Sequence, residues 1–155
     1  MLDSLSGKIA VVTGGAMGIG YGIVKRFAEY GAHVLLVDRE GEHAESAAGK
    51  LKASPGKVVV FKQDVTEEGA GDRIVDRCIK EFGTIDILVN NAGDLGLSLA
   101  PLAEMTWELF DDFYRSFLKA MVFVSKAAAK VMIDHQKQGK TVSYTHLTLP
   151  TTPYV

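Results

Sequence analysis

The chain has 155 residues, of which 47% are hydrophobic and 23% charged, and its formal net charge at pH 7 is −2. That length suits one domain with a real core, and the composition is ordinary for a globular protein. The charge balance speaks against a nucleic-acid partner or an anionic membrane surface. No stretch is long or apolar enough to span a membrane, and no signal peptide is apparent, so we expect a cytoplasmic protein. The single cysteine, Cys78, excludes an internal disulfide and fits a small core residue.

Strand-like and helix-like segments alternate along the chain. The strands are predicted as near-continuous apolar runs, typical of strands covered by helices on both faces, at residues 8–13, 33–38, 57–62 and 85–89. The helices predicted between them span residues 18–30, 40–53 and 66–82, and glycines 31 and 83 close two of them. This alternation predicts an α/β fold with a Rossmann-type, doubly wound parallel sheet, truncated after about the fourth or fifth strand.

A long helical stretch is predicted from residue 102 to about residue 132. Its apolar side chains recur three or four residues apart, which makes a packing stripe. Such a stripe can line a cofactor or partner groove, but we interpret it as part of the core. The stripe consists of Phe110, Phe113, Phe117, Met121, Val124, Ala128 and Val131. Side chains of the adjacent Asp111 and Asp112 diverge by about 100° on a helix, which favours a solvated face over an acid/base pair.

A glycine-rich turn stands at residues 13–20, which have the sequence T-G-G-A-M-G-I-G and follow the first predicted strand directly. The first turn of a helix presents unpaired N–H groups and the positive end of the helix dipole, and both attract phosphate. Glycine permits a positive φ and a close approach of the backbone to a ligand. The pattern therefore predicts a binding site for a dinucleotide.

An acidic residue, Asp38, ends the second predicted strand, 18 residues after Gly20. A carboxylate there can accept hydrogen bonds from both adenosine ribose hydroxyls, and it repels a 2′-phosphate, so it favours NAD over NADP. The neighbouring Arg39 complicates this choice, because a guanidinium can meet a 2′-phosphate. The alternative for Asp38 is a solvated helix N-cap.

Two further polar blocks follow predicted strands. Asp64 and Val65 come after the third strand, with an N-cap role for Asp64 as the alternative. The sequence N-N-A-G at residues 90–93 ends the fourth strand at the topological switch point, where such sheets bind ligands. Asparagine and glycine are also common in ordinary turns.

Together these four blocks resemble the classical short-chain dehydrogenase/reductase family, over about residues 6–140. T-G-G-A-M-G-I-G matches that family's T-G-x-x-x-G-x-G pattern, and N-N-A-G matches its second signature. The resemblance implies an NAD(P)-dependent oxidoreductase, homo-oligomeric at full length, that transfers hydride between a small-molecule alcohol or carbonyl substrate and NAD. It also implies the cofactor-binding residues: Gly14, Gly18, Ile19 and Gly20 at the pyrophosphate, Asp38 at the ribose, Asp64 and Val65 at the adenine, and Asn90, Ala92 and Gly93 toward the nicotinamide.

The catalytic pattern of that family is missing. There, a tyrosine acts as general acid/base and a lysine four residues later lowers its pKa. Tyr144 is followed at that spacing by Thr148, and Tyr154 has one residue after it. Phe117 stands where the family has the asparagine of a proton relay. We therefore assign no catalytic residue and, since the histidines lack metal-ligand spacing, no metal site. The chain as given is expected to be inactive, and the alternative is a non-catalytic nucleotide-binding module.

The last residues differ in composition from the rest. The string V-S-Y-T-H-L-T-L-P-T at residues 142–151 resembles the translation of a transposon-end adapter used in sequencing libraries. We expect residues 1–141 to be an incomplete NAD(P)-binding domain and residues 142–155 to be a non-native tail. The proximity of Ser143 and Tyr144 to the family's catalytic serine is then accidental. Residues 141–149 alternate well enough to form a fifth strand all the same. The substrate stays open among sugars, steroids, polyols and 3-oxoacyl thioesters.

Overall fold

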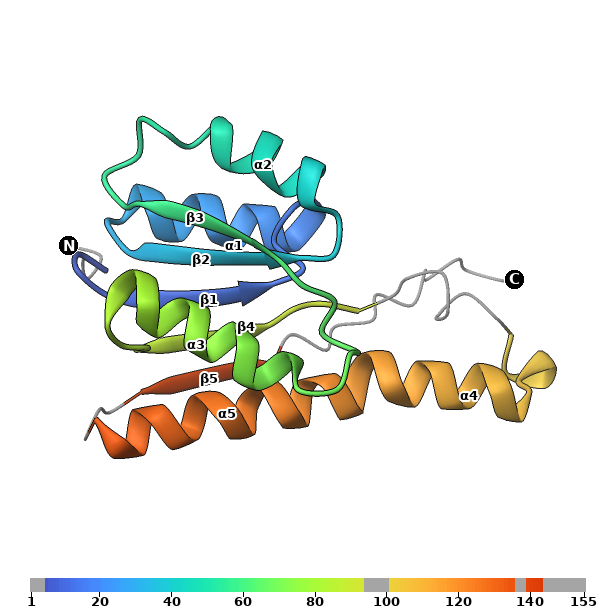
Figure 1. Ribbon diagram of the computed structural model, residues 1–155. Coiled ribbons are helices and arrows are strands. Elements are labelled where there is room, and N and C mark those ends of the chain that lie inside the picture. The colour runs from blue at the N-terminus through green and yellow to red at the C-terminus, as the bar shows by residue number, and fades with distance from the viewer. Residues whose placement is uncertain (1–4, 94–100, 136–138, 144–155) are drawn as a thin grey trace, which may run out of the picture.

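The computed structural model describes residues 5–93, 101–135 and 139–143 as a parallel sheet between two layers of helices (Figure 1). The strands lie in the order β3-β2-β1-β4-β5, and each neighbouring pair is parallel. They are β1 (Ile9–Thr13), β2 (His33–Asp38), β3 (Val58–Lys62), β4 (Ile87–Asn90) and β5 (Lys140–Ser143). The predicted α/β, Rossmann-type, doubly wound parallel sheet is confirmed.

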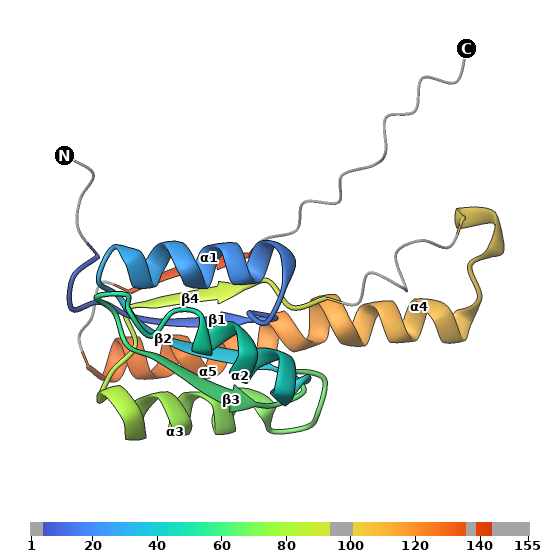
Figure 2. The same ribbon diagram turned by 90° about the horizontal axis from the view of Figure 1, so that it is seen from above.

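Five α-helices within the described residues connect or cover these strands: α1 (Gly18–Glu29), α2 (Gly41–Gly49), α3 (Ala70–Phe82), α4 (Trp107–Phe113) and α5 (Ala120–Asp134). A single turn of 3-10 helix, η2 (Leu102–Glu104), precedes α4, and a π-helical segment, η3 (Tyr114–Lys119), joins α4 to α5. Figure 2 shows α1 on one side of the sheet and α3 and α5 on the other. No helix in the described ranges combines the length and the apolar character needed to cross a lipid bilayer.

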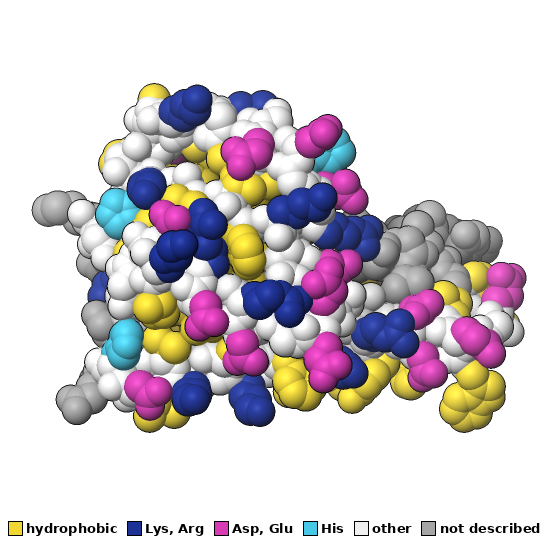
Figure 3. Space-filling view, in the orientation of Figure 1, with side chains coloured by type: hydrophobic (Ala, Val, Ile, Leu, Met, Phe, Trp, Pro, Cys, Tyr) yellow, Lys and Arg dark blue, Asp and Glu magenta, His cyan; other side chains and the backbone are white. Residues whose placement is uncertain are grey.

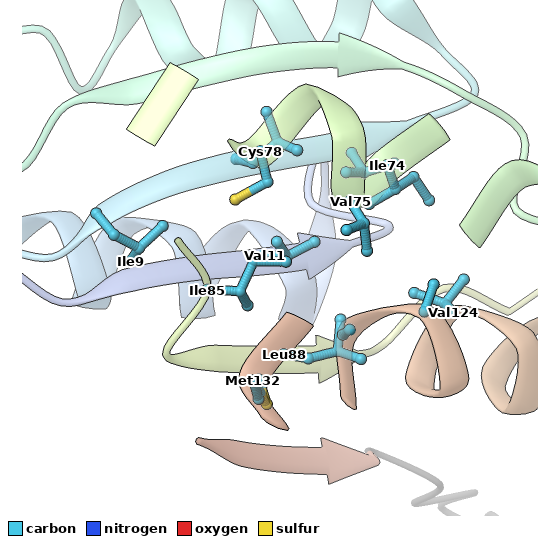
Figure 4. Close-up of a cluster of buried hydrophobic side chains, with 13 residues drawn as sticks. Ile9, Val11, Ile74, Val75, Cys78, Ile85, Leu88, Val124 and Met132 are labelled. Atoms are coloured by element: carbon cyan, nitrogen blue, oxygen red, sulfur yellow. The ribbon is translucent and has the colours of Figure 1, made fainter. Parts of the chain in front are cut away.

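Two apolar clusters form the core because alternate residues of each strand point to opposite faces. On one face, Val11 and Leu88 pack with Ile74 of α3 and Val124 of α5 (Figure 4). On the other face, Val12 and Leu36 of the sheet pack with Val24 of α1 and with Ala44 and Ala47 of α2. Cys78 is fully buried in the first cluster, as expected for a core residue.

The long predicted helix differs from the expectation at its start and in its burial. It begins at Trp107, because the Oγ1 atom of Thr106 caps it by accepting a hydrogen bond from the N–H of Leu109 at 3.1 Å. Val124 and Ala128 are buried, but Phe110 is 52% exposed. The assignment of the whole stripe to the core is therefore wrong for its first part. The reason is that α4 projects past the edge of the sheet, as Figures 1 and 2 show, and has no strand opposite it.

Two smaller expectations concern exposed parts of the chain. Asp111 and Asp112 are both exposed, and Asp112 lies 3.3 Å from the guanidinium of Arg115, so the solvated face is confirmed. Strand β5 pairs with β4 in the register Ile87↔Lys140 to Asn90↔Ser143. It thus includes two residues of the expected tail, and all four of its residues are exposed. Residues 144–155, with Tyr144, Thr148 and Tyr154, lie outside the described residues.

Candidate functional site

The carboxyl ends of β1, β2, β3 and β4 meet at one edge of the sheet, because all four strands are parallel. The glycine-rich turn follows β1 there, Asp38 ends β2, Asp64 follows β3 after one residue, and Asn90 ends β4. The structure therefore brings together at one edge all four blocks that the sequence singles out.

The glycines of the turn are required by close contacts and by backbone conformation. Gly14 has a φ of +66°, and a Cβ on it would lie 2.9 Å from the Cα of Ala92. A Cβ on Gly20 would overlap the carbonyl oxygen of Gly14 and lie 2.5 Å from Nδ2 of Asn91. Gly18 has a φ of +53° with open space on its Cβ side. Two glycines thus permit tight packing at the strand ends, and the third faces open space.

The first turn of α1 is suited to an anion. Its N-cap residue, Met17, makes no side-chain capping bond, and the first N–H groups of a helix have no acceptor within the helix. Gly18 and Ile19 are exposed, so a ligand can approach this turn. The turn is accordingly a place where backbone amides and the helix dipole can hold a pyrophosphate.

Asp38 is tied directly to the glycine-rich turn. Its Oδ2 accepts a hydrogen bond from the N–H of Ala16, and its Oδ1 accepts one from the N–H of Glu40, both at 3.0 Å. The N-cap alternative for Asp38 is wrong, because α2 begins at Gly41 and Glu40 is its N-cap. Arg39 is exposed and lies 3.9 Å from a carboxylate oxygen of Glu40.

Asp64 closes a tight turn after β3. Its Oδ1 accepts hydrogen bonds from the N–H and from the hydroxyl of Thr66, each at 2.8 Å. The N-cap alternative is wrong here too, because α3 begins at Ala70 with Gly69 as its N-cap. Val65 is half-buried against the first core cluster, close to the strand ends.

The N-N-A-G block is held by two residues that sequence reasoning did not assign to the site, Thr13 and Asn91. Thr13 Oγ1 accepts hydrogen bonds from the N–H groups of Asn91 and Ala92, and Asn91 Nδ2 donates to the carbonyl oxygens of Thr13 and Gly14. Thr13 belongs to the glycine-rich motif and Asn91 to the N-N-A-G motif, and this membership is the sequence signal that could have identified them. Asn90 is buried, and its Nδ2 donates to Ser125 Oγ of α5 at 2.9 Å, so its side chain faces the helix.

Two hollows adjoin these residues. One, of about 10 Å³, is lined by Thr13, Val65, Asn90, Ala92, Ala120, Met121 and Val124. The other, of about 190 Å³, lies between α1 and α2 and is lined by Ala16, Met17, Tyr21, His43, Ser46, Ala47 and Lys50. Within the described residues, no three His, Cys, Asp or Glu side chains gather as a metal site would require.

Comparisons with known proteins point to one family. The family model for short chain dehydrogenase matches residues 8–145. The chain is 34% identical to 3beta-hydroxysteroid dehydrogenase 2 of Eggerthella lenta, covering 90% of the chain and 53% of that protein. It is 39% identical to gluconate 5-dehydrogenase of Gluconobacter oxydans, covering 92% of the chain and 54% of that protein.

Among solved structures, a short-chain type dehydrogenase/reductase from Mycobacterium marinum superposes with a TM-score of 0.84 at 30% identity. The match covers 90% of the present chain and 54% of that one. The chain thus spans about half the length of the relatives it matches. It belongs to the short-chain dehydrogenase family.

Proposed function

We propose that this chain carries the cofactor-binding part of an NAD-dependent oxidoreductase that transfers hydride reversibly between an alcohol or carbonyl substrate and NAD. The observation that carries the proposal is the hydrogen bond from the N–H of Ala16 to Asp38, which joins the glycine-rich turn to the acid at the end of β2. Membership of an oxidoreductase family adds support.

The proposed contacts follow the cofactor along the strand ends. Gly14, Gly18, Ile19 and Gly20 hold the pyrophosphate, Asp64 and Val65 flank the adenine, and Asn90, Ala92 and Gly93 extend toward the nicotinamide. Nicotinamide supplies the hydride chemistry when it is bound, and the chain's own residues bind and orient it. The Asn90 contact is through its backbone, because its side chain is bonded to Ser125.

Asp38 sets the preference for NAD in this proposal. Each of its oxygens accepts one bond from the backbone, and a carboxylate has about four acceptor positions, so acceptors remain for the ribose hydroxyls. A 2′-phosphate in the same place meets a like charge, which disfavours NADP. The exposed Arg39 beside it can attract a 2′-phosphate, but in this proposal its effect is weaker than that of Asp38.

The test is the ratio of NADH to NADPH affinity in Asp38→Asn. We expect this variant to lose at least about tenfold of its preference for NADH, since the like charge is removed while a polar side chain stays. Asp111→Asn, an exposed aspartate on α4, is the matched control and should leave the ratio unchanged. A chain that binds neither dinucleotide, or a ratio indifferent to Asp38, contradicts the proposal.

A second candidate is a non-catalytic nucleotide-binding module. The observation that favours it is Phe117, whose half-buried ring occupies the position of the relay asparagine in the family pattern. Turnover of an alcohol by a form of the protein extended from its native gene supports the enzyme. Cofactor binding without turnover in that form supports the module.

The proposal also covers the domain limits. Residues 1–141 form an incomplete cofactor domain and residues 142–155 a non-native tail, and native DNA sequence past codon 141 tests this directly.

The proposal further includes location and assembly: the full-length protein is a cytoplasmic homo-oligomer. Exposed apolar residues along α4, η3 and α5 support the assembly; they include Trp107, Tyr114, Leu118, Val122 and Ile133. Figure 3 shows hydrophobic side chains along the lower edge of the molecule, where these helices lie.

A further inference from the structure

Among the described residues, the segment Ala92–Gly93 is held by a hydrogen bond at its start. The N–H of Ala92 donates to Thr13 Oγ1 at 3.1 Å, which anchors the start of the segment to the end of β1. Gly93, the next residue, is exposed at the carboxyl edge of the sheet. At Gly93 the contact that the structure shows is one of packing.

That packing comes from Phe117 in η3. A Cβ on Gly93 would overlap Cε1 of the Phe117 ring and lie 2.9 Å from Cδ1 and Cζ. The same ring stacks on Phe113, with 4.6 Å between centroids and 30° between the planes. The ring thus contacts both a second aromatic side chain and the backbone of Gly93.

Residues one helical turn after Phe117 also border the segment Ala92–Gly93. Ala120 and Met121 line the small hollow that Ala92 and Thr13 also line. The helix therefore borders both residues of the segment, with the Phe117 ring at Gly93 and aliphatic side chains near Ala92. A phenyl ring has no conventional hydrogen-bond donor or acceptor, so we assign its role at this position to packing.

We propose that Phe117 is a positioning residue for the nicotinamide half of the dinucleotide, acting through the backbone of Gly93. This inference rests on the proposed function. The proposed role concerns one half of the dinucleotide site, because the glycine-rich turn and Asp38 hold the adenosine and pyrophosphate without help from Phe117. ADP, which lacks the nicotinamide and its ribose, probes the first half alone, and NADH probes both halves.

The experiment measures dissociation constants for NADH and ADP in the 155-residue chain. We expect Phe117→Ala to weaken NADH binding about fivefold or more while ADP binding changes less than about twofold. Phe117→Leu keeps much of the volume and should restore part of the NADH affinity. Phe110→Ala is the matched control, because that ring is half exposed on α4, and it should alter neither constant.

A second variant, Gly93→Ala, tests the contact itself. Its methyl group must displace the ring, so we expect it to weaken NADH binding alone, and to add little in the Phe117→Ala background. Unchanged NADH binding in Phe117→Ala overturns the inference, and so does equal weakening of NADH and ADP, which indicates a purely structural role. Binding of neither ligand by the parent chain overturns the proposed function itself.

Discussion

Thr13 and Asn91 lie 78 positions apart in the sequence and hold each other at the site through two hydrogen bonds. The N–H of Asn91 donates to Thr13 Oγ1, and Asn91 Nδ2 donates to the carbonyl oxygen of Thr13, both at 3.1 Å. The same amide group donates to Gly14 at 3.0 Å. The glycine-rich turn and the N-N-A-G segment are consequently one structural unit, although they read as separate motifs.

Replacing Thr13 by valine tests this unit. The hydroxyl accepts from two partly buried N–H groups, and valine leaves both without an acceptor, so we expect the free energy of unfolding to fall by about 1–3 kcal/mol. Thr13→Ser keeps the hydroxyl and should lose much less. Urea unfolding followed by circular dichroism measures both variants. Equal stability of the valine variant and the parent contradicts the assignment.

Gly20→Ala should disrupt the turn, whereas Gly22→Ala should not. A Cβ at position 20 overlaps the carbonyl oxygen of Gly14, which is backbone and cannot move aside cheaply. A Cβ at position 22 meets nothing within 4 Å, and alanine favours the helix by up to about 1 kcal/mol there. We expect Gly20→Ala to lose NADH binding and stability, and Gly22→Ala to match or exceed the parent in melting temperature. Similar melting of the two variants speaks against the close packing.

Cys78 should be unreactive in the folded chain. Burial, with a smaller contribution from the negative charge of Asp86, raises the pKa of its thiol from 9.0 to about 12. The thiolate is the reactive form, so iodoacetamide at pH 8 should label the chain only after urea is added. Between about pH 9 and 12 the unfolded thiol ionises while the folded one stays protonated. Stability should therefore fall faster with pH in the parent than in Cys78→Ala. Rapid labelling without urea contradicts this account.

The exposed apolar residues of α4 to α5 should cause self-association. Ile133 is 74% exposed, and Leu118 and Val122 are each 48% exposed. Sedimentation should show a mass that rises with concentration, because burying such residues between copies removes apolar surface from water. Leu118→Ser combined with Val122→Ser should shift the chain toward monomer. Lys130→Ser, an exposed polar position on α5, should leave the mass distribution as it is.

The fold was predictable because its signals are local. Apolar runs between helical segments marked β1 to β4, and positive-φ glycines ended helices at Gly31 and Gly83 as expected. The two N-cap alternatives failed because each acid bonds to an amide two residues on, ahead of the helix start. The burial of the Phe110 to Val131 stripe was misjudged because periodicity gives the spacing of a face but not what lies opposite it. The hydrogen bonds between Thr13 and Asn91 and the packing of Phe117 on Gly93 join segments that are distant in the sequence, and no local pattern encodes such contacts.

The most direct test of the central claim is an NMR titration of the isotope-labelled chain with NADH. The account predicts that amide shifts concentrate at Gly18, Ile19, Gly20, Val65 and Gly93, and that NADPH produces the same shifts only at higher concentration. Shifts confined to the hollow between α1 and α2, or no shifts at saturating NADH, contradict the claim that the carboxyl edge of this sheet binds a nicotinamide dinucleotide.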